Sequence, residues 1–210
     1  MSSAARPQRP VVREACDQVL ARLNGSSPDY VAGLLTGATA AFQRARERQS
    51  LDIVWTGPES GIATSRLTAA TVIDLVRQAR REILLVSYAT QTEPGLAAAL
   101  ADAASRGVEI TLITERRADN PAYVGADAPF PGLRAIRLHW PASQRAPGAS
   151  LHAKIIVVDD EITLVTSANL TNRAMEANLE CGILIRGGPQ PYAVRDHISR
   201  LRTSGVLRHL

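Results

Sequence analysis

The segment from residue 150 to residue 180 constrains this chain most, because polar residues there alternate with short apolar runs. His152 and Lys154 are one residue apart, so an extended strand would project both side chains from one face. The apolar, β-branched run at 155–158 predicts a buried strand, and the run at 162–165 predicts a second strand that returns after a polar turn.

Ser167 and Asn169 follow the second predicted strand and are again one residue apart. If the two strands fold back on each other, an imidazole, an ammonium, a hydroxyl and a carboxamide gather at one rim of the sheet. Such a set suits a phosphodiester, because His152 can attack phosphorus or protonate a leaving oxygen. Lys154 and Asn169 can stabilise the negative charge that develops on the equatorial oxygens.

Lys154 is the only lysine in the chain, so every other side chain counted among the 24 lysines and arginines is an arginine. An ammonium is a compact point charge, and the planar guanidinium fork does not replace it at every site. We therefore interpret Lys154 as a functional residue. The alternative is that a single lysine has survived by chance at the end of a strand.

The spacing of these residues resembles the HKD motif of the phospholipase D superfamily: His152-x-Lys154, Asp159, and Ser167-x-Asn169. The resemblance covers about residues 51–203 and implies an α/β fold, with a mixed, largely parallel sheet flanked by helices. Thr166 departs from the pattern, since the family usually has glycine there. A β-branched residue restricts the backbone where glycine would permit close approach to phosphate.

The resemblance also implies a two-step transfer that needs no metal and no cofactor. One histidine attacks phosphorus to form a phosphohistidine, and a second histidine protonates the leaving oxygen. Glu180 resembles the acid that hydrogen-bonds the histidine ring, while Asp159, at the turn, is expected to have a structural or interface role. Because the chain holds one His-x-Lys, two histidines require two chains, and we predict an obligate homodimer with a composite active site.

The rest of the sequence predicts an N-terminal helical extension at 1–50, followed by a catalytic domain at 51–210. Apolar residues at helical spacing predict two helices in the extension, at 11–23 and 30–49, which would form a helical hairpin. From residue 51 onward, strands alternate with helices, which is typical of parallel units. We expect strands at 52–55, 82–88, 108–114 and 133–139, and helices at 66–80 and 94–106.

Loops rich in proline and glycine at 116–132 and 141–150 flank one of these strands. Loops of this length around a site usually shape substrate access. We expect several residues on loops or at strand ends to contact substrate: Arg116, Arg117, Arg145, Glu59 and Tyr88. His139 lies outside the motif, and we interpret it as structural or interfacial.

The composition sets outer limits on function. A net charge of +4 and a sequence pI of about 9.6 allow a polyanionic partner such as nucleic acid. The two cysteines, Cys16 and Cys181, form no disulfide framework or metal-ligand spacing. The chain has no apolar run of the ~20 residues needed to span a bilayer and no signal peptide, so we predict a cytoplasmic protein without membrane association.

Small single-motif members of the superfamily are mostly nucleases, so we expect a nuclease that acts on DNA. The N-terminal helices, with the sequences at 53–60 and 87–90, resemble the phospholipase D-like (DrmC-like) component of DISARM anti-phage systems. That resemblance implies bacterial anti-phage defence and other DISARM proteins as partners. Two alternatives stay open: a lipid or small-molecule phosphodiesterase, and a non-catalytic subunit that binds DNA or proteins.

Overall fold

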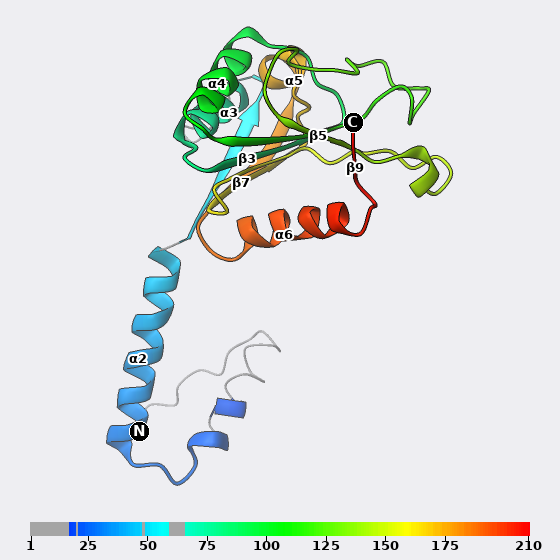
Figure 1. The fold of residues 1–210 in the computed structure, drawn as a ribbon. Coiled ribbons are helices and arrows are strands. Elements are labelled where there is room, and N and C mark those ends of the chain that lie inside the picture. The colour runs from blue at the N-terminus through cyan, green and yellow to red at the C-terminus, as the bar shows by residue number, and fades with distance from the viewer. Residues whose placement is uncertain (1–16, 20, 48, 59–65) are drawn as a thin grey trace. The chain divides into compact units, whose positions relative to one another are not determined.

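The structure is a computed structural model that describes residues 17–19, 21–47, 49–58 and 66–210 (Figure 1). It consists of two units, Met1–Glu47 and Arg48–Leu210. In the first unit, residues 17–19 and 21–23 are helical, and α2 spans Pro28–Glu47. Most of the helix predicted at 11–23 lies outside the described residues, so the helical hairpin stays a prediction.

The second unit is built on a mixed sheet, in which the described strands follow the order β2-β1-β8-β7-β6-β3-β4-β5-β9. The strands are β1 (Ser50–Thr56), β2 (Arg66–Leu67), β3 (Glu82–Ser87), β4 (Glu109–Thr114), β5 (Ile136–His139), β6 (Ile155–Val158), β7 (Ile162–Thr166), β8 (Glu180–Arg186) and β9 (Arg208–His209). The helices of this unit are α3 (Thr68–Gln78), α4 (Pro94–Ser105), α5 (Asn172–Glu176) and α6 (Gln190–Thr203), with a 3₁₀ turn at Ala142–Gln144.

The predicted mixed α/β sheet with flanking helices is confirmed, but the expectation that it is largely parallel is wrong. Among the described strands, only the pairs β1–β2, β3–β4 and β4–β5 are parallel, and five pairs are antiparallel. The physical reason lies in the connections. Strands joined through α4 can be parallel, whereas the short turn between β6 and β7 permits only antiparallel pairing.

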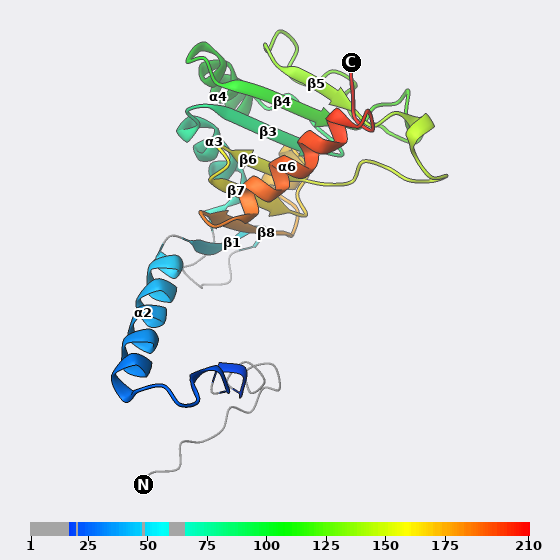
Figure 2. The ribbon, with the colours of Figure 1, turned by 60° about the horizontal axis from the view of Figure 1, so that its bottom comes forward.

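Helices cover the two faces of the sheet unequally. In Figure 1, α3, α4 and α5 lie on one side of the sheet, and α6 lies on the other. A hydrophobic core lies on each face of the sheet, and alternate residues of β3 belong to one or the other. Ile83 and Leu85 pack with α3 and α4, whereas Leu84 and Val86 pack in the cluster that α6 borders. Figure 2 shows α6 crossing its face of the sheet obliquely. The sheet is therefore buried on both sides at its centre, which explains the continuous apolar run of β3.

The turn between β6 and β7 fastens the motif hairpin to the rest of the fold. Asp159 and Asp160 both have positive φ, 54° and 61°, as the central residues of a type I′ turn require. The Asp159 carboxylate accepts hydrogen bonds of 2.8–2.9 Å from the backbone N–H groups of residues 80–82. Asp160 forms a two-pronged ion pair with Arg195 of α6. These contacts fit the structural role predicted for Asp159.

Candidate active site

One edge of the sheet collects the predicted motif residues, because neighbouring strands alternate in direction there. β6 runs antiparallel to β3, so the residues before β6 lie beside those that follow β3. β7 ends and β8 begins at this same edge. The edge therefore carries His152, Lys154, Ser167, Asn169 and Glu180.

His152 and Lys154 lie just before β6, which begins at Ile155, so they are not on the strand itself as predicted. They nevertheless contact each other. The Lys154 Nζ lies 3.1 Å from His152 Nδ1 and donates a 2.7 Å hydrogen bond to the His152 carbonyl oxygen. His152 is exposed, whereas Lys154 is only 8% exposed. The exposed His152 imidazole thus lies against the largely buried Lys154 ammonium.

The environment of Lys154 weakens its hold on the proton. Burial lowers the pKa of Lys154, and the nearby Glu180 carboxylate raises it by less, so the pKa stays below its ordinary value of 10.5. A charge removed from water acts on a neighbouring anion through a lower effective dielectric constant. Lys154 is therefore placed to stabilise a negative charge that reaches His152.

Aromatic rings form one wall beside the histidine. The Tyr88 ring lies 5.1 Å from the His152 ring, centroid to centroid, and Lys154 Nζ lies 5.7 Å from the Tyr88 centroid. Tyr88 thus borders the site. Behind it, the buried Tyr123 makes an edge-to-face contact with Tyr88 at 5.5 Å. Sequence reasoning missed Tyr123, for which the only signal was an aromatic residue in a loop of a chain with few aromatics.

Asn169 is held at the site by the segment that follows β3. The backbone N–H of Ala89 donates a 3.2 Å hydrogen bond to Asn169 Oδ1, and the N–H of Leu170 donates to the Ser87 hydroxyl. Thr90 and Leu170 also form an isolated parallel bridge. The loops after β3 and β7 are therefore joined, and they orient the Asn169 carboxamide.

Glu180 differs from its predicted role within the chain. Among the hydrogen bonds of the described residues, its carboxylate accepts from the Ser167 hydroxyl at 2.5 Å and from Asn178 Nδ2 at 3.0 Å, not from His152. The Ser167 oxygen in turn accepts from the Cys181 N–H. The charge of the Glu180 carboxylate acts to raise the pKa of Lys154, against the larger effect of burial. The expectation that it orients the histidine ring is therefore not met within one protomer.

Thr166 is accommodated by a glycine on the neighbouring strand. It pairs with Gly182, where a Cβ atom would lie only 2.9 Å from the Thr166 Cβ. The Thr166 hydroxyl accepts from the Ala168 N–H and donates to the Cys181 carbonyl. The residue that replaces the family's glycine therefore has space supplied by a glycine across the sheet.

The residues predicted to contact substrate differ in exposure and in their hydrogen-bond partners. Arg117 is exposed, and Arg116 is partly exposed with its Nε 2.9 Å from Asp119 Oδ2. Asp119 also hydrogen-bonds His139 Nδ1 at 2.7 Å, which agrees with a structural interpretation of His139. Glu59 lies outside the described residues.

Arg145 requires a correction. Its side chain is 3% exposed, and its guanidinium forms two hydrogen bonds, of 2.7 and 2.8 Å, with the fully buried Glu115. Burial raises the pKa of Glu115, but hydrogen bonds from Arg145, Leu151 and Arg116 lower it by more, so the carboxylate stays charged. Arg145 is thus committed to Glu115 and is not a free phosphate contact. No motif marks Glu115, which sequence reasoning missed.

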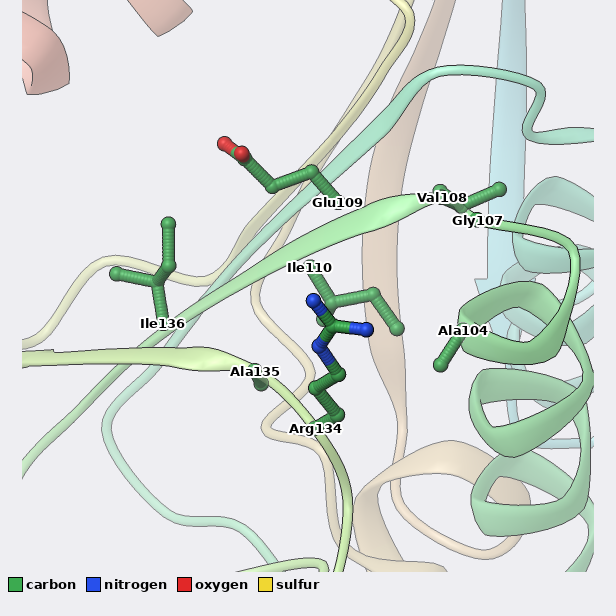
Figure 3. A pocket seen from close by; sticks show the side chains of 8 residues that line it. All are labelled: Ala104, Gly107, Val108, Glu109, Ile110, Arg134, Ala135 and Ile136. Carbon is green, nitrogen blue, oxygen red and sulfur yellow. The ribbon is translucent and has the colours of Figure 1, made fainter.

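The cavities formed by the described residues include one that the motif lines and one that it does not. A hollow of about 450 Å³ lies between α4 and the amino ends of β4 and β5, bordered by Glu109 and Arg134 (Figure 3). None of the motif residues lines it. The small cavity that Lys154 and Asn169 do line has room for about 10 Å³. His152, by contrast, is exposed at the surface of the described residues.

The chain belongs to the family described as the PLD-like domain of cardiolipin synthase, whose model matches residues 72–202. Cardiolipin synthase A of Pseudomonas syringae pv. syringae (strain B728a) is 28% identical over 153 residues, which cover 68% of this chain and 32% of that protein. Cardiolipin synthase A of Pseudomonas putida (strain W619) is 31% identical over 112 residues, covering 53% and 23%. The chain thus spans a third or less of these curated relatives.

Solved structures show the same fold. Nuc from Salmonella typhimurium, a phospholipase D family member, has a TM-score of 0.58 at 18% identity, covering 77% of this chain and 98% of that one. NucT from Helicobacter pylori has a TM-score of 0.54 at 17% identity, covering 74% and 96%. Phosphatidylserine synthase from Haemophilus influenzae Rd KW20 has a TM-score of 0.58 at 18% identity, covering 77% and 40%. Of the helices described here, none combines the length and hydrophobicity needed to cross a bilayer.

Proposed function

We propose that this chain is a phosphodiesterase, with its catalytic domain at 51–210, and that His152 is the nucleophile. The supporting observation is the exposed His152 imidazole, whose Nδ1 lies 3.1 Å from the largely buried ammonium of Lys154. Nε2 attacks phosphorus in the tautomer that carries the ring proton on Nδ1, and in that tautomer the Lys154 ammonium donates its hydrogen bond to the His152 carbonyl oxygen. Lys154 and Asn169 stabilise the phosphoryl oxygens as charge develops on them.

The proposed reaction has two balanced steps. In the first, His152 Nε2 forms a bond to phosphorus while the bond to one ester oxygen breaks, and a second histidine gives that oxygen its proton. In the second, the same histidine takes a proton from water, whose oxygen displaces His152 from phosphorus. The second histidine is His152 of another copy of this chain, so the active unit is a homodimer.

An exposed apolar surface next to the site supports the homodimer. We call it the apolar strip; its members are 43–65% exposed and lie on β1, β7 and β8: Leu51, Ile53, Trp55, Val165 and Ile183. Ile183 pairs with Ile53 on one side and Val165 on the other, so the strip runs across three strands. Such a patch is typical of an interaction surface.

We propose a second copy of this chain as the occupant of the apolar strip. At its site end, Trp55 pairs with Cys181, whose N–H donates to Ser167 of the motif. A twofold axis through the strip would therefore bring two motif edges together. This is the arrangement that a chain with one His-x-Lys needs for two histidines in one site.

We propose DNA as the substrate and anti-phage defence, together with other DISARM proteins, as the context. The supporting observations are the net charge of +4, the exposed His152 and the N-terminal helical unit. The curated relatives are described as cardiolipin synthase A, and this favours a lipid phosphodiester as the second candidate. A non-catalytic DNA- or protein-binding subunit is the third.

The test is cleavage of labelled single- and double-stranded DNA in EDTA, beside hydrolysis of phospholipid in vesicles. Wild-type protein is compared with His152→Ala and with His197→Ala, a histidine on α6 away from the motif edge. DNA cleavage that survives EDTA and is lost only in His152→Ala supports the nuclease. If phospholipid hydrolysis, and not DNA cleavage, is lost only in His152→Ala, the substrate is a lipid. Equal behaviour of all three proteins on both substrates overturns the catalytic proposal.

A further inference from the structure

The loop before His152 is anchored by a buried ion pair. Arg145 lies in the connection from β5 to β6, and its two terminal nitrogens reach the two oxygens of Glu115 at 2.7 and 2.8 Å. Its Nε donates a 2.8 Å hydrogen bond to the Trp140 carbonyl, and the guanidinium lies 5.0 Å from the Trp140 ring centroid. Because both partners are removed from water, the fork geometry holds the loop in one position.

The same carboxylate also holds the residue beside the nucleophile. Glu115 Oε2 accepts a 3.0 Å hydrogen bond from the backbone N–H of Leu151, whose side chain is buried in the core on the α6 side of the sheet. On the other side of His152, its carbonyl oxygen accepts from Lys154. The backbone of His152 is thus fixed from both directions, once by Glu115 and once by Lys154.

We propose that Glu115 and Arg145 form a positioning clamp that sets the place of His152 at the site. The inference rests on the proposed role of His152 as nucleophile. The clamp does not touch substrate. It acts through the Leu151 N–H, and it restricts the motion of a histidine that otherwise lies exposed before the start of β6. Effective attack on phosphorus needs near-attack geometry, and a shift of about 1 Å can cost 10²-fold in rate.

The structure offers a matched control for this clamp. Arg195 on α6 also makes a two-pronged contact, through Nε and one terminal nitrogen, with Asp160 at 2.7 and 2.6 Å; this pair is partly exposed and lies at the turn end of the β6–β7 hairpin, opposite the site edge. Arg145→Lys and Arg195→Lys each keep the charge and remove the fork. A purely structural role predicts that both variants lose stability and that neither changes His152.

The experiment measures steady-state hydrolysis of bis(p-nitrophenyl) phosphate and the NMR signals of the His152 ring. The chain has four histidines, so the His152 signals can be assigned by their loss in His152→Ala. For Arg145→Lys we expect kcat to fall by roughly 10- to 100-fold with KM little changed. We also expect the His152 signals to shift or broaden, whereas Arg195→Lys leaves kcat and these signals unchanged.

Unchanged His152 signals in Arg145→Lys, or the same change in both variants, would overturn the clamp. The NMR measurement does not need turnover. If the protein hydrolyses no phosphodiester, the proposed function is refuted, and the His152 signals still test the clamp. If Arg145→Lys does not fold, Glu115→Gln takes its place, because the amide keeps the side-chain volume and one acceptor oxygen. Shifted or broadened His152 signals in Glu115→Gln then support the clamp, and unchanged signals overturn it.

Discussion

Replacing Asp159 by asparagine tests the account of the motif hairpin most sharply. Asparagine also tolerates positive φ, so the turn keeps its backbone and only the hydrogen bonds change. In the native protein, Oδ1 accepts from the N–H groups of Arg81 and Glu82, and Oδ2 accepts from that of Arg80. In the variant, the oxygen that accepts from Arg81 and Glu82 is no longer charged. The NH₂ group replaces Oδ2 and faces the Arg80 N–H, which then has no acceptor.

The expected cost follows from those three bonds. Leaving one part-buried N–H without an acceptor costs about 1–3 kcal/mol, and the two remaining bonds lose roughly 0.5–1 kcal/mol each. Asp159→Asn is thus expected to be destabilised by about 2–5 kcal/mol at pH 7. For a unit the size of residues 48–210, this lowers the Tm by roughly 4–20 °C.

The loss should depend on pH. Burial raises the pKa of Asp159, but the backbone hydrogen bonds and Arg81 lower it by more, so it lies below its ordinary value of 3.8. A depressed pKa contributes stability that is present above the unfolded-state pKa and is lost as the pH falls through the folded-state value. The difference between wild type and variant should therefore be constant near pH 7 and shrink below about pH 4.

Urea unfolding from pH 7 to pH 3 measures this difference. Asp102→Asn is the control, since its carboxylate pairs with Arg106 on an exposed helix surface and is expected to change stability by less than about 1 kcal/mol. A wild-type protein no more stable than Asp159→Asn at pH 7 would refute the reasoning, as would a difference that does not change with pH.

Three further perturbations address the site and its interface. Gly182→Ala should cost about 1–3 kcal/mol in urea unfolding, because its Cβ would lie 2.9 Å from that of Thr166, and adding Thr166→Gly should recover part of the loss; additive losses would contradict this. Lys154→Met should lower kcat by about 100-fold or more while the Tm is kept, and full activity would contradict its role. Ile183→Asp should convert a dimer to a monomer in analytical ultracentrifugation and abolish hydrolysis, whereas Val124→Asp, at an exposed loop position, should do neither; a dimeric Ile183→Asp protein would contradict the apolar strip as the interface.

Local patterns could predict that the motif residues lie near one another, because His152, Lys154 and Asn169 flank a hairpin whose strands and turn are encoded by adjacent residues. Asp159 could be assigned to a turn for the same reason. Its actual partners, the N–H groups of residues 80–82, come from a distant part of the chain. No local pattern contains them.

The wrong expectations concern side-chain partners and strand directions, which the pattern of residue types does not specify. Arg145 lies on a polar loop, and only the folded chain reveals that Glu115, at the end of another strand, buries its guanidinium. Glu180 matched a motif by spacing, and within one protomer its carboxylate accepts hydrogen bonds from Ser167 and Asn178, so its role toward the histidine ring stays a prediction. The sheet was expected to be largely parallel because apolar runs do not encode strand direction, which depends on the connections.

Trapping of the covalent intermediate tests the central claim most directly. Protein turning over bis(p-nitrophenyl) phosphate in EDTA is quenched in alkaline denaturant, which preserves phosphohistidine, and its peptides are analysed by mass spectrometry. The account predicts a nitrophenyl-phosphoryl adduct on His152 that is missing from the His152→Ala protein. Product formation with His152 unmodified, or an adduct on a different residue, would contradict it.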